Sequence, residues 1–139
     1  MVEEVSSEVL EIRTTAYSHT EADHLKYGRK NAIGGRLKFG TVRSAAADWS
    51  RYPLGTKFKI IGKEDTLYVV DDYGRALVGK DVIDLYKPTQ RQMRQWGVRH
   101  VEIEIVEWGS FEESLRVLKP RVRYASHVRR MVRQLQAKS

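Results

Sequence analysis

Four aspartates fall within the segment YVVDDYGRALVGKDVIDLYKP, which runs from Tyr68 to Pro88. Two of them, Asp72 and Asp84, lie next to Val, Ile and Leu in segments typical of buried strands. An ionised carboxylate is costly to remove from water, so these carboxylates are either paired or chemically active. Apolar neighbours favour the neutral form of a carboxyl group, which is the form that a general acid needs. The other two aspartates, Asp71 and Asp81, are predicted to be surface charges.

Short strands separated by turns must position these side chains. The residue pattern predicts strands at residues 10–17, 40–48, 57–61, 67–72, 82–86 and 99–108. In the last of these, Val101, Ile103 and Ile105 alternate with glutamates, as in a half-buried strand. Residues 88–97 predict one short helix that ends on glycine. About six strands with one small helix fit a closed barrel better than an open sheet.

The polar stretch at residues 18–36 has no sustained period and contains three glycines. We interpret it as a long loop with at most one helical turn, and long loops in compact domains are often functional. His19 and His24 share this loop with Glu21 and Asp23, but their spacing matches no strong ligand motif. No metal site and no cofactor is therefore predicted.

Length and composition indicate one soluble core with an appendage. The chain has 139 residues, of which 41% are hydrophobic and 31% charged, which argues against wholesale disorder. No apolar run approaches the roughly 18 residues that a membrane span needs. The absence of cysteine excludes disulfides, thiolate metal sites and a cysteine nucleophile.

The net charge of +7 is concentrated at the C-terminal end. Residues 110–139 carry eight Lys and Arg against two acids, whereas the first 109 residues carry 17 basic and 16 acidic groups. Ser110 and Glu113 have the spacing of a capping box, and one helical face further on holds Val128, Met131, Val132 and Leu135. We therefore predict an N-terminal segment at 1–9, a barrel domain at 10–108 and a basic α-helical extension at 109–139.

Several short motifs occur in a recognisable order along residues 13–106. They are TTAY at 14–17, an aspartate (Asp48) shortly before PLGT at 53–56, an Asp-x-Gly-x-Ala-x-x-Gly turn at 72–79, and IDLY at 83–86. In this order they resemble the 3D domain family, which is named for three aspartates and is related to the catalytic region of membrane-bound lytic transglycosylase A. The resemblance covers about two thirds of the chain.

The resemblance implies a mainly β fold, a six-stranded double-psi β-barrel, here with a short helix and the basic helical C-terminal extension. It implies a peptidoglycan lytic transglycosylase that cleaves the β-1,4 bond between N-acetylmuramic acid and N-acetylglucosamine and leaves 1,6-anhydromuramoyl ends. Glycan strands of peptidoglycan would be the partner, and the location would be periplasm or cell envelope, although the opening residues MVEEVSSEVLEIR do not resemble a secretory signal. A monomer without a membrane span is expected.

The family's three aspartates correspond to Asp48, Asp72 and Asp84, which are the candidate catalytic residues. The resemblance assigns Asp84 as the acid, and its position between Ile83 and Leu85 predicts a pKa well above the roughly 3.9 of a free aspartate. Asp72, at the start of the glycine turn, is predicted to be the ionised partner. Asp48 is either catalytic or an acceptor for backbone N–H groups of the turn that follows it.

The candidate substrate-binding residues are Tyr17, Asn31, Gly74, Arg75, Gly79 and Lys80. The two glycines would allow the backbone to approach a sugar chain closely. Tyr17, like Trp49, either stacks on a sugar face or belongs to the core. Arg75 and Lys80 either meet the lactyl or carboxylate group of a muramoyl unit or are simply solvated. The chain departs from the family where NAIGG at 31–35 replaces Thr-Ala-Thr-Gly-Thr and where Arg75 replaces a glycine.

Two other functions compete with this interpretation. A double-psi barrel can also be a non-catalytic carbohydrate-binding module, in which Asp72 and Asp84 need not share one groove. The basic C-terminal residues suggest a nucleic-acid binder, but the nearly neutral first 109 residues contain no nucleic-acid motif, so no nucleic-acid partner is predicted.

Overall fold

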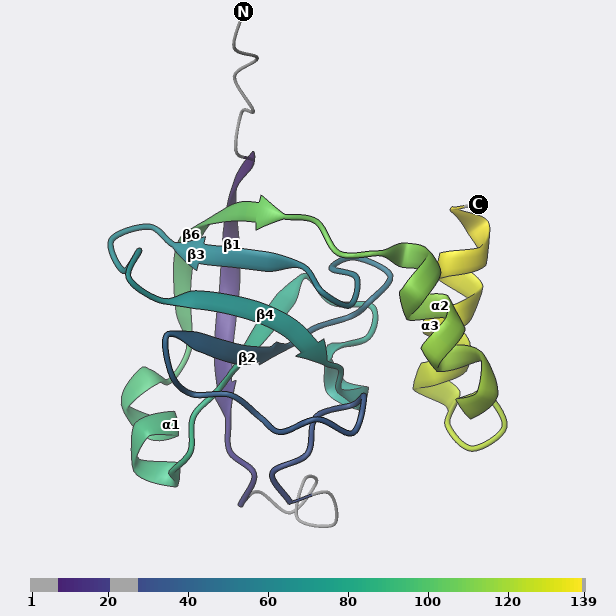
Figure 1. Ribbon diagram of the computed structural model, residues 1–139, viewed down its shortest axis with the longest axis horizontal. Coiled ribbons are helices and arrows are strands. Elements are labelled where there is room, and N and C mark those ends of the chain that lie inside the picture. The colour runs from purple at the N-terminus through teal and green to yellow at the C-terminus, as the bar shows by residue number, and fades with distance from the viewer. Residues whose placement is uncertain (1–7, 21–27, 139) are drawn as a thin grey trace, which may run out of the picture.

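The structure is a computed structural model, and it describes residues 8–20 and 28–138 (Figure 1). Six strands close into a mixed barrel in the order β1-β5-β2-β4-β3-β6. The strands are β1 (Glu8–Tyr17), β2 (Val42–Ala46), β3 (Lys57–Ile60), β4 (Leu67–Asp72), β5 (Val82–Tyr86) and β6 (Arg99–Glu107). The predicted mainly β fold, its closed barrel and all six strands are confirmed, with strand ends that differ from the predicted ones by a few residues.

The barrel contains two parallel strand pairs, β1 with β5 and β2 with β4. All other neighbours are antiparallel, including β2 with β5 and both pairings of β6. The two parallel pairs are therefore joined to each other through the antiparallel contact between β2 and β5. The candidate site lies at this contact between β2 and β5.

Apolar side chains fill the barrel interior, because successive residues of a strand point to opposite faces of the sheet. Ile83 and Leu85 of β5, and Ile103 of β6, are completely buried there. Phe58 of β3 stacks on Tyr68 of β4 with ring centroids 5.2 Å apart. A second, smaller apolar cluster lies on the opposite, outer face of the strands and consists of Tyr17, Leu37, Ala46, Leu77, Val82 and Tyr86.

The helix α1 (Gln90–Trp96) is the short helix that the sequence predicts. It begins where the Thr89 side chain accepts a hydrogen bond from the Gln92 N–H, and it ends at Gly97, whose φ of 64° is left-handed. Trp96 is buried against the barrel and donates its indole N–H to the Thr14 hydroxyl at 3.0 Å.

The C-terminal residues form two helices, α2 (Phe111–Leu118) and α3 (Ser126–Ala137), which lie together beside the barrel (Figure 1). The predicted cap is confirmed because the Ser110 hydroxyl accepts the Glu113 N–H. The four apolar residues of the predicted helical face are all buried, and they share one continuous core with barrel-side residues such as Trp49 and Tyr52. The domain limits at 9 and 108 stay a prediction. No helix in the described ranges is long and apolar enough to cross a bilayer.

Gly109 joins the barrel to α2 at a very close backbone contact. A Cβ atom at this position would lie 2.2 Å from the carbonyl oxygen of Leu54, so only glycine fits. Its N–H donates to the Thr56 hydroxyl, and the next N–H, of Ser110, donates to Leu54. The helical pair is therefore fixed to the barrel by backbone contacts as well as by its apolar face.

Candidate active site

Asp84 lies on the outer face of the barrel, opposite its apolar sequence neighbours. Because side chains alternate along β5, Ile83 and Leu85 point into the interior while Asp84 points away from it. Asp84 pairs with Thr15 of β1 on one side and with Ala46 of β2 on the other. The Thr15 hydroxyl donates to Asp84 Oδ1 at 2.9 Å. Ile83 and Leu85 therefore do not desolvate this carboxyl group as the sequence predicted, and Asp84 is half-buried.

A β-bulge sets the position of Asp72. Between β2 and β4, Ala45 pairs with Val70 and Ala46 pairs with Asp72, which leaves Asp71 as an extra residue. Ala46 therefore has Asp72 on one neighbouring strand and Asp84 on the other. Neighbouring strands lie about 4.8 Å apart, so the two aspartates have backbones about 10 Å apart on one face.

Asp72 is the more deeply buried carboxyl group of this pair. Its side chain is only 6% exposed, and burial raises its pKa to about 7. The hydrogen bond from Tyr17 opposes this effect, whereas the negative charges of Asp71 and Asp84 add to it. A pKa of about 7 lies close to neutral pH, and the role of Asp72 as the ionised partner stays a prediction.

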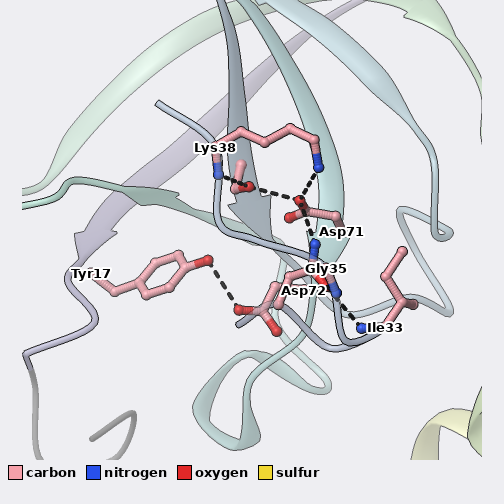
Figure 2. A network of polar contacts seen from close by, with 8 residues as sticks. Tyr17, Ile33, Gly35, Lys38, Asp71 and Asp72 are labelled. Carbon is pink, nitrogen blue, oxygen red and sulfur yellow. Dashed lines mark hydrogen bonds and ion pairs between the residues drawn. The ribbon is translucent and has the colours of Figure 1, made fainter. Parts of the chain in front are cut away.

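Tyr17 links β1 to Asp72 across the outer face. Its hydroxyl donates to Asp72 Oδ2 at 3.1 Å (Figure 2). Burial, followed by the charges of Asp72, Asp71 and Asp84, raises the pKa of Tyr17 well above 10, so the phenol keeps its proton. Its ring is buried against Tyr86, with centroids 5.6 Å apart. Tyr17 belongs to the core and orients Asp72, and its ring is not an open stacking surface for a sugar.

Asp71 holds the segment at residues 31–38 against the barrel (Figure 2). Its Oδ2 accepts hydrogen bonds from the Ser44 hydroxyl at 2.7 Å, the Asn31 amide at 3.1 Å and the Lys38 ammonium group at 3.4 Å. Burial raises the pKa of Asp71, and these three donors oppose the increase. Asp71 is 3% exposed, so the prediction of a surface charge is wrong. Asp81, in contrast, is exposed as predicted and accepts the Tyr52 hydroxyl.

Asn31 connects the segment at residues 31–38 to Asp71. Its side-chain oxygen accepts the N–H groups of Ile33 at 3.1 Å and Gly35 at 2.8 Å, while its amide nitrogen donates to Asp71. The residue is buried, and all these contacts are within the protein. Asn31 thus shapes the segment that lies beside Asp72, and a direct role in substrate binding stays a prediction.

Asp48 has the contacts of a structural residue. Its Oδ1 accepts the backbone N–H and the hydroxyl of Ser50, and its Oδ2 accepts the Gly79 N–H at 2.8 Å. It is 2% exposed and joins its own turn to the connection between β4 and β5. The next residue, Trp49, is fully buried and donates its indole N–H to the carbonyl of Asp72 at 2.8 Å. Trp49 therefore contacts the backbone of Asp72 directly, whereas Asp48 fixes the connection that follows Asp72.

The connection between Asp72 and Asp84 contains a short 3-10 turn at Arg75–Leu77. Gly79 has a φ of +85°, which favours glycine, but Gly74 has an extended backbone that other residues also adopt. Arg75 and Lys80 are exposed on this connection. Their predicted contacts with substrate stay a prediction.

The possible metal ligands fall mostly outside the described residues, since Glu21, Asp23 and His24 lie in the range 21–27. His19 is described, and its Nδ1 lies 2.8 Å from the Tyr86 hydroxyl. Within residues 8–20 and 28–138, no three His, Asp or Glu side chains form a group that could hold a metal ion.

The sequence interpretation missed three residues of the site, namely Thr15, Ser44 and Asp71. Thr15 was detectable, because it alternates with Tyr17 on the strand that the parallel pairing places beside Asp84. The sequence around Asp71 and Ser44 shows no comparable pattern, because their contact depends on the bulge between β2 and β4.

The fold and the site define a small, closed mixed barrel with two carboxyl groups on its outer face, one buried and one half-buried. Such a pair is suited to acid and base chemistry. Residues 43–107 match the model of the 3D domain, which confirms the resemblance over this part of the chain. The match includes Asp48, Asp72 and Asp84. The 3D family comprises cell-wall-related barrels like those of lytic transglycosylases. No curated protein matches the chain.

Proposed function

We propose that this protein is a lytic transglycosylase of peptidoglycan. It cleaves the β-1,4 bond between N-acetylmuramic acid and N-acetylglucosamine and leaves a 1,6-anhydromuramoyl end. The observation that carries the proposal is the placement of Asp72 and Asp84 on either side of Ala46, within the residues that match the 3D domain. A non-catalytic binding module would not require two carboxyl groups at this spacing.

Asp84 is the proposed catalytic residue because it is the more accessible carboxyl group of the pair. It donates its proton to the departing glycosidic oxygen and then accepts the proton of the muramoyl 6-hydroxyl as that oxygen attacks the anomeric carbon. One C–O bond breaks and one forms, no water is consumed, and Asp84 ends the cycle protonated. The hydrogen bond from Thr15 orients the carboxyl group for both transfers.

Asp72 has a supporting electrostatic role in this proposal. Two carboxylates on one face repel each other, so the pair favours holding one proton near neutral pH. A glycan strand lying over Asp84 displaces water from it, which favours the neutral acid there and the ionised form on Asp72. Ionised Asp72 then stabilises the positive charge that develops at the anomeric carbon.

We also propose that the barrel has the double-psi topology of this family. Its two parallel pairs, β1 with β5 and β2 with β4, joined through β2 and β5, support this assignment. An extracytoplasmic location follows from the proposed substrate and stays a prediction. The monomeric state and the assignment of residues 109–139 as a basic extension stay predictions as well.

Digestion of purified sacculi tests the proposed activity. The protein should release muropeptides whose masses are lower by one water than those of hydrolysed products. Muropeptides with ordinary reducing ends would instead indicate a hydrolase. Tight binding to sacculi without any release would favour the alternative, a carbohydrate-binding module.

A further inference from the structure

A hollow of about 490 Å³ lies between α3 and the turn that follows β2. The residues that matter for its chemistry are Asp48, Arg51, Gly79, Arg130, Arg133 and Lys138. Three of them belong to the C-terminal residues that pack beside the barrel (Figure 1). The hollow is separate from the outer face that carries Asp84, and the proposed mechanism does not use it.

The acidic group that lines the hollow, Asp48, is already engaged. Both of its oxygens accept hydrogen bonds from Ser50 or Gly79, as described above. The Arg51 guanidinium lies 3.8 Å from Asp48 Oδ2 and also donates to the carbonyl of Gly79. Asp48 and Arg51 therefore balance each other, and the charge left in the hollow comes from α3.

Arg130 and Arg133 supply this positive charge. They are three residues apart on α3, so their side chains leave the helix on the same side. Within the described ranges, no carboxylate lies within salt-bridge distance of either guanidinium. Gly79 lies close to Arg130, since a Cβ atom there would be 3.9 Å from Arg130 Nη1, and both residues line the hollow.

His127, near the start of α3, is affected by the charge of Arg130 as well. Burial lowers its pKa, and the charges of Arg75 and Arg130 lower it further. Two guanidinium groups from different elements, the β4–β5 connection and α3, therefore act on one side chain. An anion that enters the hollow would meet a positive potential that the protein itself leaves uncompensated.

The hollow adjoins the segments that position the catalytic pair. Gly79 lies on the connection between Asp72 and Asp84, and its N–H ties that connection to Asp48. A muramoyl residue carries a lactyl-linked peptide stem with free carboxylates, and guanidinium groups bind carboxylates through paired hydrogen bonds. We propose that Arg130 and Arg133 form a subsite for a carboxylate of this peptide stem, an inference that rests on the proposed function.

Binding measurements on the Asp84→Asn protein test the subsite without turnover. The probes are a short peptidoglycan glycan with its peptide stems, the same glycan after an amidase has removed the stems, and inorganic phosphate. We expect the stem-bearing glycan to bind about tenfold more tightly than the stripped one, as one charge-assisted contact would give. Adding Arg130→Gln and Arg133→Gln should make the two glycans bind equally.

A charge-matched control is Arg91→Gln with Arg123→Gln, because both arginines are exposed and lie outside the hollow. This pair should keep the preference for stems, and thermal melting should show all variants folded. A preference that survives in the Arg130 and Arg133 variant overturns the subsite, and so does equal binding of both glycans to the parent. Phosphate that binds more tightly than the stem-bearing glycan, and through the same arginines, overturns the assignment to peptide stems. Release of anhydro products by the wild-type protein is scored separately, so a failed subsite leaves the proposed activity intact.

Discussion

Asp72 and Asp84 share one face of the barrel because each pairs with Ala46 from an opposite side. One is buried and the other half-buried, so two residues of the same type have different environments. The negative charge of Asp84 contributes to the raised pKa of Asp72, which means that the two groups are electrostatically coupled. Substitution of each residue in turn separates the contributions of the two.

Asp84→Asn should abolish release of anhydro products, with a loss of at least about 100-fold, because an amide cannot relay the proton. It should also lower the pKa of Asp72 from about 7, since a neighbouring negative charge is removed. Product analysis and carboxyl NMR titration measure the two effects. Asp65→Asn, in the exposed turn between β3 and β4, is the matched control and should change neither. Full activity in the Asp84 variant would remove this residue as the acid.

Stability should fall with rising pH because of Asp72. Its pKa is raised from 3.8 to about 7 in the folded state, so the folded protein binds one proton more than the unfolded chain in that interval. Its contribution is present at low pH and is lost as pH rises through about 7, with a slope of up to about 1.4 kcal/mol per pH unit. Asp72→Asn should remove this slope in urea unfolding series, whereas Asp65→Asn should retain it. An unchanged slope in the Asp72 variant would contradict the raised pKa.

Tyr17→Phe tests the hydrogen bond to Asp72 while leaving the aromatic ring in place. Because this hydrogen bond lowers the pKa of Asp72, its loss should move ionisation of Asp72 to higher pH. The free energy of unfolding should fall by about 1 kcal/mol. Carboxyl titration by NMR gives the first effect and denaturant unfolding the second. The control Tyr124→Phe, at a residue that is 82% exposed, should change neither quantity. A lower pKa of Asp72 in the Tyr17 variant would refute the assigned hydrogen bond.

Asn31→Ala should loosen the segment at residues 31–38. The substitution leaves Asp71 with one donor fewer and the N–H groups of Ile33 and Gly35 without their acceptor. We expect a loss of about 1–3 kcal/mol in stability and faster amide exchange at Gly35. Ile33→Ala, on the same segment but half exposed, is the control. Unchanged exchange at Gly35 would show that Asn31 does not hold the segment.

The sequence predicted most of the barrel because its strands alternate clearly. Ile103 and Ile105 of β6 are buried as expected, and Thr89 and Gly97 bound the predicted helix. These features depend on residues close in sequence, where the period of a strand or the chemistry of a cap is directly visible. The motif order also identified Asp72 and Asp84, which do share one face.

The environments of the aspartates were not predictable in the same way. Ile83 and Leu85 adjoin Asp84 in sequence but lie on the other side of the sheet, so they say nothing about its solvation. Asp71 is buried because a bulge in the pairing of β2 with β4 makes it the extra residue of its strand, and because Asn31 and Ser44 reach it from distant parts of the chain. Register and long-range contacts decide both cases, and neither leaves a local pattern.

The most direct test of the central claim is digestion of sacculi in water labelled with heavy oxygen. If the muramoyl 6-hydroxyl is the nucleophile, the wild-type protein should release anhydro ends that contain no label, and Asp84→Asn should release none. Reducing ends that carry the heavy oxygen would show that water is the nucleophile, and would contradict the proposed lytic transglycosylase.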